Sequence, residues 1–100
     1  MYNKLLSLAG LARRAGKLSL GFDACEDSMK SGKAQLLLLA ADLSERTVRN
    51  ISNTADKTNT CVIRTKIPME QLGAAVGKVT GIISVNDSGF ADKMKTICTE

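Results

Sequence analysis

The stretch Leu36-Leu37-Leu38-Leu39-Ala40 decides the fold of this sequence. It belongs to an apolar run that lies between Gln35 and Asp42. So short a run favours a β-strand covered on both faces over a helix. Because a covered strand needs amphipathic helices above and below it, we expect this segment to be the central strand of a sheet packed between helices.

Helical and strand-like patterns alternate on both sides of this strand. Helices are predicted where apolar residues recur at a spacing of three and four, and strands where short runs alternate or are β-branched. The predicted helices cover about residues 3–15, 21–32, 44–55, 68–77 and 88–98, and the predicted strands 17–20, 36–40, 61–64 and 82–85. This order predicts an α/β fold, a three-layer α/β/α sandwich around a mixed four-stranded sheet. We expect a single domain over residues 1–100.

Several local contacts follow from the same patterns. Asp42 and Ser44 are both candidates to cap the third helix, and Asp87 or Ser88 can cap the last one. Pro68 suits the first turn of the fourth helix. The spacing of four residues also predicts two ion pairs, which are Glu26 with Lys30 and Glu45 with Arg49.

The composition excludes several classes of function. Histidine is absent, so mechanisms built on a Ser-His or Cys-His pair are removed. The 14 basic residues exceed the 10 acidic ones and give a net charge of +4, which favours an anionic partner such as nucleic acid. The three cysteines are too few and too widely spaced for a disulfide framework or a zinc site, and we expect reduced core thiols. No apolar run is long enough for a membrane span or a signal peptide, and we expect a cytoplasmic protein.

Three sequence features could suggest chemistry, and a simpler interpretation fits each of them better. The run from Gly73 to Thr80 lacks the glycine spacing and the Lys-Ser/Thr pair of a phosphate-binding loop, which argues against nucleotide hydrolysis. The acidic residues 23, 26 and 27 could suggest a metal site, but a solvated face at a helix start explains them better. Cys25 could be a nucleophile near a helix start, yet it shares an apolar stripe, so we expect it to be buried.

Basic residues adjoin two predicted chain reversals. Arg13, Arg14 and Lys17 surround the end of the first helix, and Lys30 and Lys33 bracket Gly32. Such groups can bind phosphate. They can equally complement helix carboxyl ends and keep the protein soluble, and charge alone does not separate the two interpretations.

A pattern of short motifs resembles one known family. It comprises the Gly16-Lys17 turn, Gly21 at a helix start, Ser31-Gly32-Lys33-Ala34 before the apolar strand, Asp42 after it, and Leu72-Gly73-Ala74-Ala75-Val76-Gly77-Lys78. In order and spacing these motifs resemble the L7Ae/L30e family of ribosomal proteins, which binds kink-turn RNA, and most closely its small bacterial YlxQ-like branch. The likeness covers nearly the whole chain, and the family fold is an α/β/α sandwich.

The resemblance implies a non-enzymatic RNA-binding protein that acts with structured or ribosomal RNA. The implied contact regions are residues 21–27, 42–43 and 78–81. Amides and Asp23 would meet base edges, Lys17, Lys33 and Lys78 would neutralise phosphates, and Val79 would pack on a base. The full set of expected contact residues is Arg14, Lys17, Gly21, Phe22, Asp23, Lys33, Lys78 and Val79. No cofactor or metal is expected, and the chain is expected to be a monomer, with the ribosome or a protein as a further partner.

Three positions depart from the family motif Gly-x-Asn-Glu-x-x-Lys. Here Asp23 stands for the Asn, Ala24 for the guanine-reading Glu, and Asp27 for the phosphate-contacting Lys. The last change alters the local charge by two units beside a polyanion and weakens binding unless nearby cations compensate. A second hypothesis is therefore a protein-interaction module that has the same fold but has lost kink-turn recognition.

Overall fold

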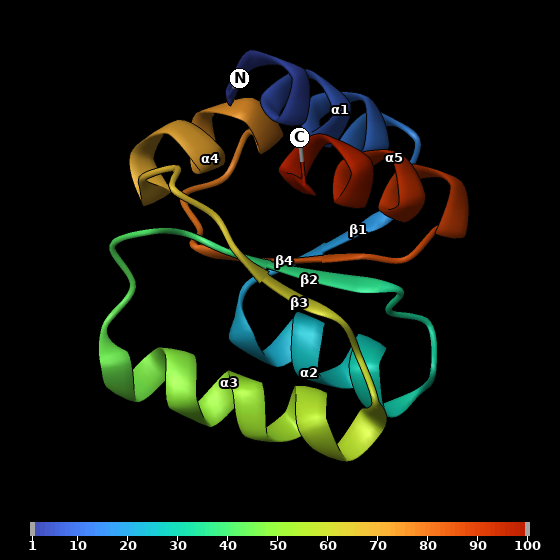
Figure 1. The fold of residues 1–100 in the computed structure, drawn as a ribbon, viewed down its shortest axis with the longest axis vertical. Helices are drawn as coiled ribbons and strands as arrows, with labels where there is room; N and C mark the ends of the chain where they lie inside the picture. Colours follow the sequence, from blue (N-terminus) through green and yellow to red (C-terminus); the bar gives the residue numbers. More distant parts are fainter. Residues whose placement is uncertain (1, 100) are drawn as a thin grey trace.

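The chain folds as a four-stranded sheet between two layers of helices (Figure 1). The structure is a computed structural model and describes residues 2–99. Helices α1, α4 and α5 cover one face of the sheet, and α2 and α3 cover the other (Figure 1). The elements are α1 (Tyr2–Arg14), β1 (Leu18–Leu20), α2 (Phe22–Lys30), β2 (Leu36–Leu39), α3 (Glu45–Thr58), β3 (Val62–Arg64), α4 (Met69–Val76), β4 (Ile82–Val85) and α5 (Ser88–Thr99). The predicted fold class and element order are confirmed.

The sheet is mixed and has the strand order β1-β4-β2-β3. Strand β2 pairs in parallel with β3, because helix α3 carries the chain back between them. Strand β4 runs antiparallel to both of its neighbours. Its residue Ile83 lies opposite Leu38 of β2 on one side and opposite Leu20 of β1 on the other. Strand β2 is thus an internal strand, as its continuous apolar run predicts.

Two apolar cores lie on the two faces of the sheet. Successive side chains of a strand point to opposite faces, so Leu36 and Leu38 enter the core beneath α1, α4 and α5. Leu37 and Leu39 enter the second core with Cys25 of α2 and Ile51 of α3. The leucine run is therefore completely buried because each face of the strand has its own helical layer.

The helix ends agree only in part with the sequence predictions. Ser44 caps α3, since its hydroxyl accepts a hydrogen bond from the Thr47 amide at 3.2 Å. Asp42 instead accepts from the amide of Met69 at 2.8 Å and so serves the start of α4. Asp87 caps α5 by accepting from the amide of Phe90 at 2.9 Å.

Two further local predictions were wrong. Pro68 lies at the N-cap of α4, one position before the predicted first turn. Glu45 forms its ion pair with Arg64 on β3, at 3.1 Å, and not with Arg49. The end of β3 lies close enough to the start of α3 for the Arg64 guanidinium to donate a hydrogen bond to the Glu45 carboxylate.

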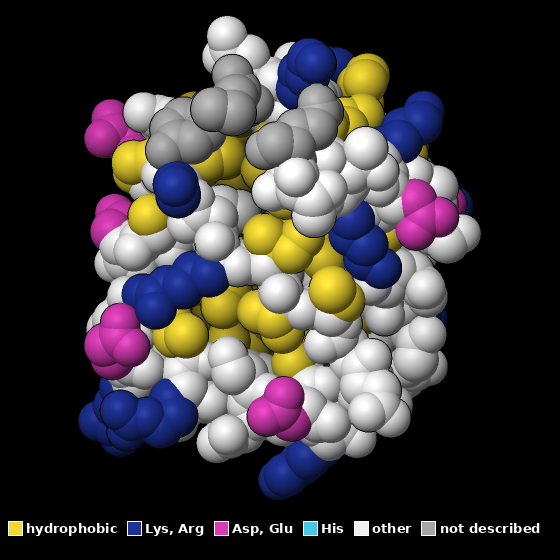
Figure 2. Space-filling view, viewed as in Figure 1, with side chains coloured by type: hydrophobic (Ala, Val, Ile, Leu, Met, Phe, Trp, Pro, Cys, Tyr) yellow, Lys and Arg dark blue, Asp and Glu magenta, His cyan; other side chains and the backbone are white. Residues whose placement is uncertain are grey.

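The edge strand β3 lies at the front of the molecule in the view of Figure 1. Hydrophobic side chains gather across the middle of this face, over the edge strand β3, and charged side chains are spread around them (Figure 2). Val62 and Ile63 of β3 are half-buried. Within residues 2–99, no helix has the length and apolar character that crossing a bilayer requires.

Candidate nucleic-acid interface

Three segments far apart in the sequence meet at one end of the sheet. They are the start of α2 (residues 21–24), the segment after β2 (residues 40–43) and the loop between α4 and β4 (residues 77–81), and we call them the loop end. The amide of Gly21 donates to the carbonyl of Ile82 at 2.9 Å, and the amide of Ala40 donates to that of Gly81 at 2.8 Å. The start of β4 therefore holds both other segments in place.

Gly21 gives the start of α2 an unusual backbone. Its φ of 90° and ψ of 166° lie in a region that is essentially restricted to glycine. No side chain caps the helix, and its first backbone bond runs from the Cys25 amide to the Gly21 carbonyl at 3.0 Å. The amides of residues 22–24 thus precede the first helical bond, and they lie at the positive end of the helix dipole, where an oxygen acceptor is favoured.

The side chains at this helix start have different environments. Phe22 is half-buried and packs against the second core. Asp23 and Ala24 are exposed to solvent. Asp23 is therefore placed to meet hydrogen-bond donors on a ligand, whereas Phe22 anchors the helix start to the protein.

The loop from Gly77 to Gly81 presents one apolar side chain to solvent. Val79 is 83% exposed, while the adjacent Thr80 is buried. The Thr80 hydroxyl donates to the Ile82 carbonyl at 3.1 Å and accepts from the Ile82 amide at 3.3 Å. These two bonds fix the loop, so the exposure of Val79 is built into a rigid turn.

Glycines hold this loop against its neighbours. A Cβ at Gly73 would lie 2.9 Å from the Lys78 carbonyl oxygen, so the loop packs directly on the backbone of α4. A Cβ at Gly81 would lie 2.7 Å from a methyl carbon of Leu43. Leu43 therefore rests on the loop backbone and joins two of the three segments of the loop end.

The charges near α2 are partly engaged within the protein. Glu26 lies 3.7 Å from Lys30, as predicted, and accepts a hydrogen bond from Thr54 of α3 at 3.0 Å. Asp23 and Asp27 are exposed. Among residues 2–99, no three His, Cys, Asp or Glu side chains form a group that could hold a metal ion.

The expected contact residues fall into two groups in the structure. Gly21, Phe22, Asp23, Lys78 and Val79 lie at the loop end. The other three, Arg14, Lys17 and Lys33, lie at the opposite end of the sheet, where β1 and β2 begin. All three lie at the other end of the sheet from Asp23. Lys33 is the one nearest in the chain to Asp27, whose charge these cations were expected to offset, and its amide donates to the Ser28 carbonyl at 2.9 Å.

Cys25 is a core residue and not a nucleophile. Its side chain is completely buried and its thiol lies 3.3 Å from the Ser19 carbonyl oxygen. Burial raises the pKa of the Cys25 thiol to about 11, which suppresses the reactive thiolate. The sequence also predicted that Cys61 and Cys98 would lie in the core, and this is wrong. Cys61 is exposed just before β3, and Cys98 is exposed near the end of α5.

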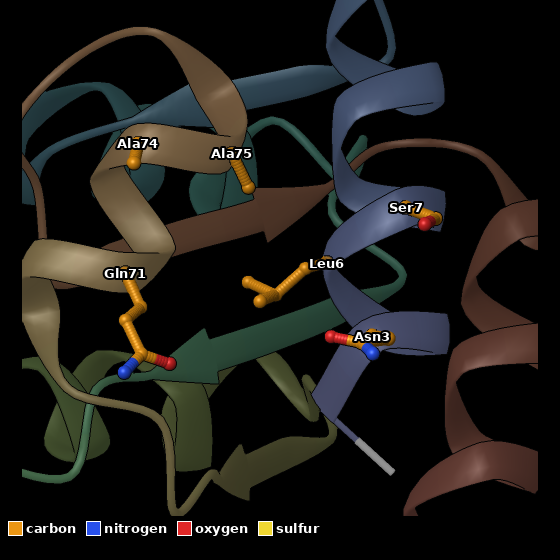
Figure 3. Close-up of a pocket in the computed structure, with 6 residues that line it drawn as sticks. All are labelled: Asn3, Leu6, Ser7, Gln71, Ala74 and Ala75. Carbon is orange, nitrogen blue, oxygen red and sulfur yellow. The ribbon is translucent and has the colours of Figure 1, made fainter.

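A shallow pocket that the sequence did not reveal lies between α1 and α4 (Figure 3). Its volume is about 570 Å3, and Leu6 and Gln71 extend toward it from the two helices (Figure 3). The remaining lining residues are Asn3, Ser7, Ala74 and Ala75. Small side chains on α4 leave this space open, and no sequence motif marks such a gap between two helices.

Comparison with known proteins decides the family. The model of the ribosomal protein L7Ae/L30e/S12e/Gadd45 family matches residues 3–95. The chain belongs to this family. It is similar to the RNA-binding protein YlxQ of Bacillus subtilis, with 33% identity over 94 residues and 87% of each chain covered.

A second relative and a solved structure are also similar to this chain. The large ribosomal subunit protein eL30 of Eremothecium gossypii is 30% identical over 89 residues, which cover 87% of this chain and 85% of eL30. A solved structure of a protein of unknown function from Bacillus halodurans C superposes with a TM-score of 0.90 and 30% identity. That superposition covers 97% of this chain and 98% of the other. The YlxQ-like branch expected from the motifs is thus confirmed.

Proposed function

We propose that this L7Ae-family chain is a non-enzymatic RNA-binding protein that holds structured or ribosomal RNA at its loop end. The observation that carries the proposal is Val79, which is 83% exposed on a loop at the same end of the sheet as the uncapped start of α2. The names of its relatives, RNA-binding protein YlxQ and ribosomal protein eL30, support the same ligand class. The chain acts as a monomer in this proposal.

The proposed mechanism is complementarity without chemistry. The amides of residues 22–24 and the Asp23 carboxylate meet base edges, and Lys78 contacts a phosphate. Val79 packs against an unstacked base, which shields an apolar side chain that the protein itself leaves in water. Exposed loop regions of an RNA suit these contacts better than a regular duplex, whose bases remain stacked.

The test compares the two large apolar side chains that the described part of the chain exposes. Val79→Ser should weaken binding by about fivefold, because about 1 kcal/mol of apolar contact is lost. Leu11, which is 49% exposed on α1, gives the matched control Leu11→Ser, for which unchanged affinity is expected. Fluorescence anisotropy would use a kink-turn RNA and a plain duplex, and filter binding would use total bacterial ribosomal RNA. Equal affinities for both variants and the wild type on every probe would reject the proposal.

A specific observation supports the alternative of a protein-interaction module. Asp23 and Asp27 are exposed on α2, and Arg14, Lys17 and Lys33 lie at the other end of the sheet from Asp23. If α2 contacts a protein, Asp27→Lys should improve affinity for kink-turn RNA and weaken the native protein contact. A loss of RNA affinity in Asp27→Lys would contradict this alternative.

A further inference from the structure

The end of the sheet opposite the loop end carries its own group of cations. Arg14, Lys17 and Lys33 define it, and we call it the basic end. The amide of Asn86 donates to the Lys17 carbonyl at 2.7 Å, and the amide of Gln35 donates to the Val85 carbonyl at 2.8 Å. Val85, the last residue of β4, and Asn86, which follows it, therefore hold the segments of Lys17 and Lys33 on either side of one strand end.

These three side chains remain available for an external partner. All three are exposed, and none forms an ion pair with a carboxylate of residues 2–99. The acidic residue nearest in the chain to this strand end, Asp87, uses a carboxylate oxygen to cap α5. The basic end thus presents three full positive charges to solvent.

Helix dipoles account for only part of this charge. Helices α1 and α2 both end here, and each exposes carbonyls equivalent to roughly half a negative charge. Arg14 lies in the last turn of α1 and complements it directly. Lys17 and Lys33 lie three residues beyond the last residues of their helices, so a surplus of about two positive charges remains.

We propose that the basic end is a second RNA contact surface, which binds the sugar-phosphate backbone of the same RNA that the loop end holds. This inference rests on the proposed function. Lysines without a fixed partner bind phosphates without reading sequence, so the surface adds affinity and orientation but no base specificity. The chain then clamps two segments of a folded RNA, one at each end of the sheet.

The dimensions of the molecule set the spacing of the two segments. Strand β4 spans about 10 Å between the loop end and the basic end, and the whole molecule measures 30 × 27 × 26 Å. An RNA held at the loop end must therefore extend at least about 10 Å along β4 before it meets the basic end. A short RNA that only fills the loop end should not touch Lys17 or Lys33.

The experiment uses the full-length protein and two probes, a kink-turn RNA with minimal stems and the same RNA with each stem lengthened by about ten base pairs, roughly 30 Å of duplex. The test variant is Lys17→Gln with Lys33→Gln. The matched control is Lys4→Gln with Arg49→Gln, which removes the same charge from exposed positions on α1 and α3. Filter binding at several salt concentrations and hydroxyl-radical footprinting give the two measurements.

The proposal predicts a salt effect on the long RNA alone. Loss of two phosphate contacts should reduce the slope of log affinity against log salt by about 1.4 to 1.8, and should weaken binding about 20-fold at 0.15 M salt. Footprint protection should disappear from the added stem and remain at the loop. The short RNA and the control variant should keep wild-type behaviour.

Other outcomes overturn the inference in distinguishable ways. If the test variant keeps the wild-type slope and footprint while Val79→Ser weakens binding, the loop end binds RNA and the basic end does not. The basic end would then be a surface for an acidic protein. If the wild-type protein binds neither RNA at 50 mM salt, kink-turn recognition fails and this clamp with it, while ribosomal RNA still tests the proposed function.

Discussion

Replacing Gly73 by alanine should displace the loop that carries Val79. The added Cβ would lie 2.9 Å from the Lys78 carbonyl oxygen and 3.0 Å from the Val79 Cα, and both are backbone atoms that cannot rotate away. Overpacking of this kind costs about 1–3 kcal/mol. Alanine regains roughly 1 kcal/mol of helix propensity in α4, so the expected net loss in the free energy of unfolding is about 1 kcal/mol.

The assay for Gly73→Ala combines stability and binding. Thermal unfolding should show a melting temperature lowered by about 4–8 °C for a domain of this size. Affinity for RNA should fall about tenfold, because the shifted loop no longer places Val79 and Lys78 beside the start of α2. The RNA affinity is measured well below the melting temperature, where the variant is folded.

Gly10 on α1 provides the matched control. It is also a helical glycine packed on backbone, and its Cβ would lie 3.2 Å from the Ala75 carbonyl oxygen, outside the loop. Gly10→Ala should therefore leave the RNA affinity unchanged even if its melting temperature shifts. A Gly73→Ala protein with wild-type stability and wild-type affinity would refute the reasoning.

Three more outcomes follow from the structure. Asp42→Ala should lower the free energy of unfolding by about 1 kcal/mol because the Met69 amide loses its acceptor, whereas Asp42→Asn should retain most of it; equal stability of the two variants in urea unfolding would contradict this. Burial raises the pKa of the Cys25 thiol from 9.0 to about 11, so between these pH values the folded protein keeps a proton that the unfolded chain loses. The free energy of unfolding should therefore fall by about 2–3 kcal/mol as pH rises from 9 to 11. Cys25→Ala should reduce this pH dependence, and an equally steep pH dependence in Cys25→Ala would contradict the attribution to Cys25. A thiol reagent at pH 8 should label Cys61 and Cys98 rapidly and Cys25 only after unfolding, and rapid labelling of all three would show that the core is open.

The fold was predictable because its signals are local. The run Leu36–Leu39 can be recognised from sequence alone, because four consecutive apolar residues in so short a segment indicate a strand that is buried on both faces. Gly77 ends α4 with a φ of 78°, a conformation that glycine adopts without strain. Patterns of this kind depend only on neighbours in the chain.

Contacts between distant residues were the part that sequence could not supply. Asp42 stands next to α3 in the sequence, yet its carboxylate serves the amide of Met69, 27 residues away. Glu45 has Arg49 one helical turn ahead, but the end of β3 brings Arg64 closer. Local spacing gives a candidate partner in each case, and the packing of the sheet decides between candidates.

The candidate site was predicted in part. The resemblance placed Gly21, Leu43 and Val79 in one surface, and the sheet does bring them to one end. Lys17 was assigned to the RNA contacts because it adjoins the chain reversal after the first helix. Strand β1 occupies the residues between Lys17 and Gly21, so the two positions lie at opposite ends of a strand, a separation that the predicted strand itself already implied.

NMR chemical-shift mapping of the backbone amides during addition of RNA locates the RNA-binding surface. If the loop end binds a kink-turn RNA or a ribosomal RNA fragment, the amides of residues 22–24 and 79–81 should show the largest shifts. The bound RNA should also cover the methyl groups of Val79, which are exposed to water in the free protein. Shifts concentrated in the pocket between α1 and α4 or along α3, with residues 22–24 and 79–81 unchanged, would contradict binding at the loop end.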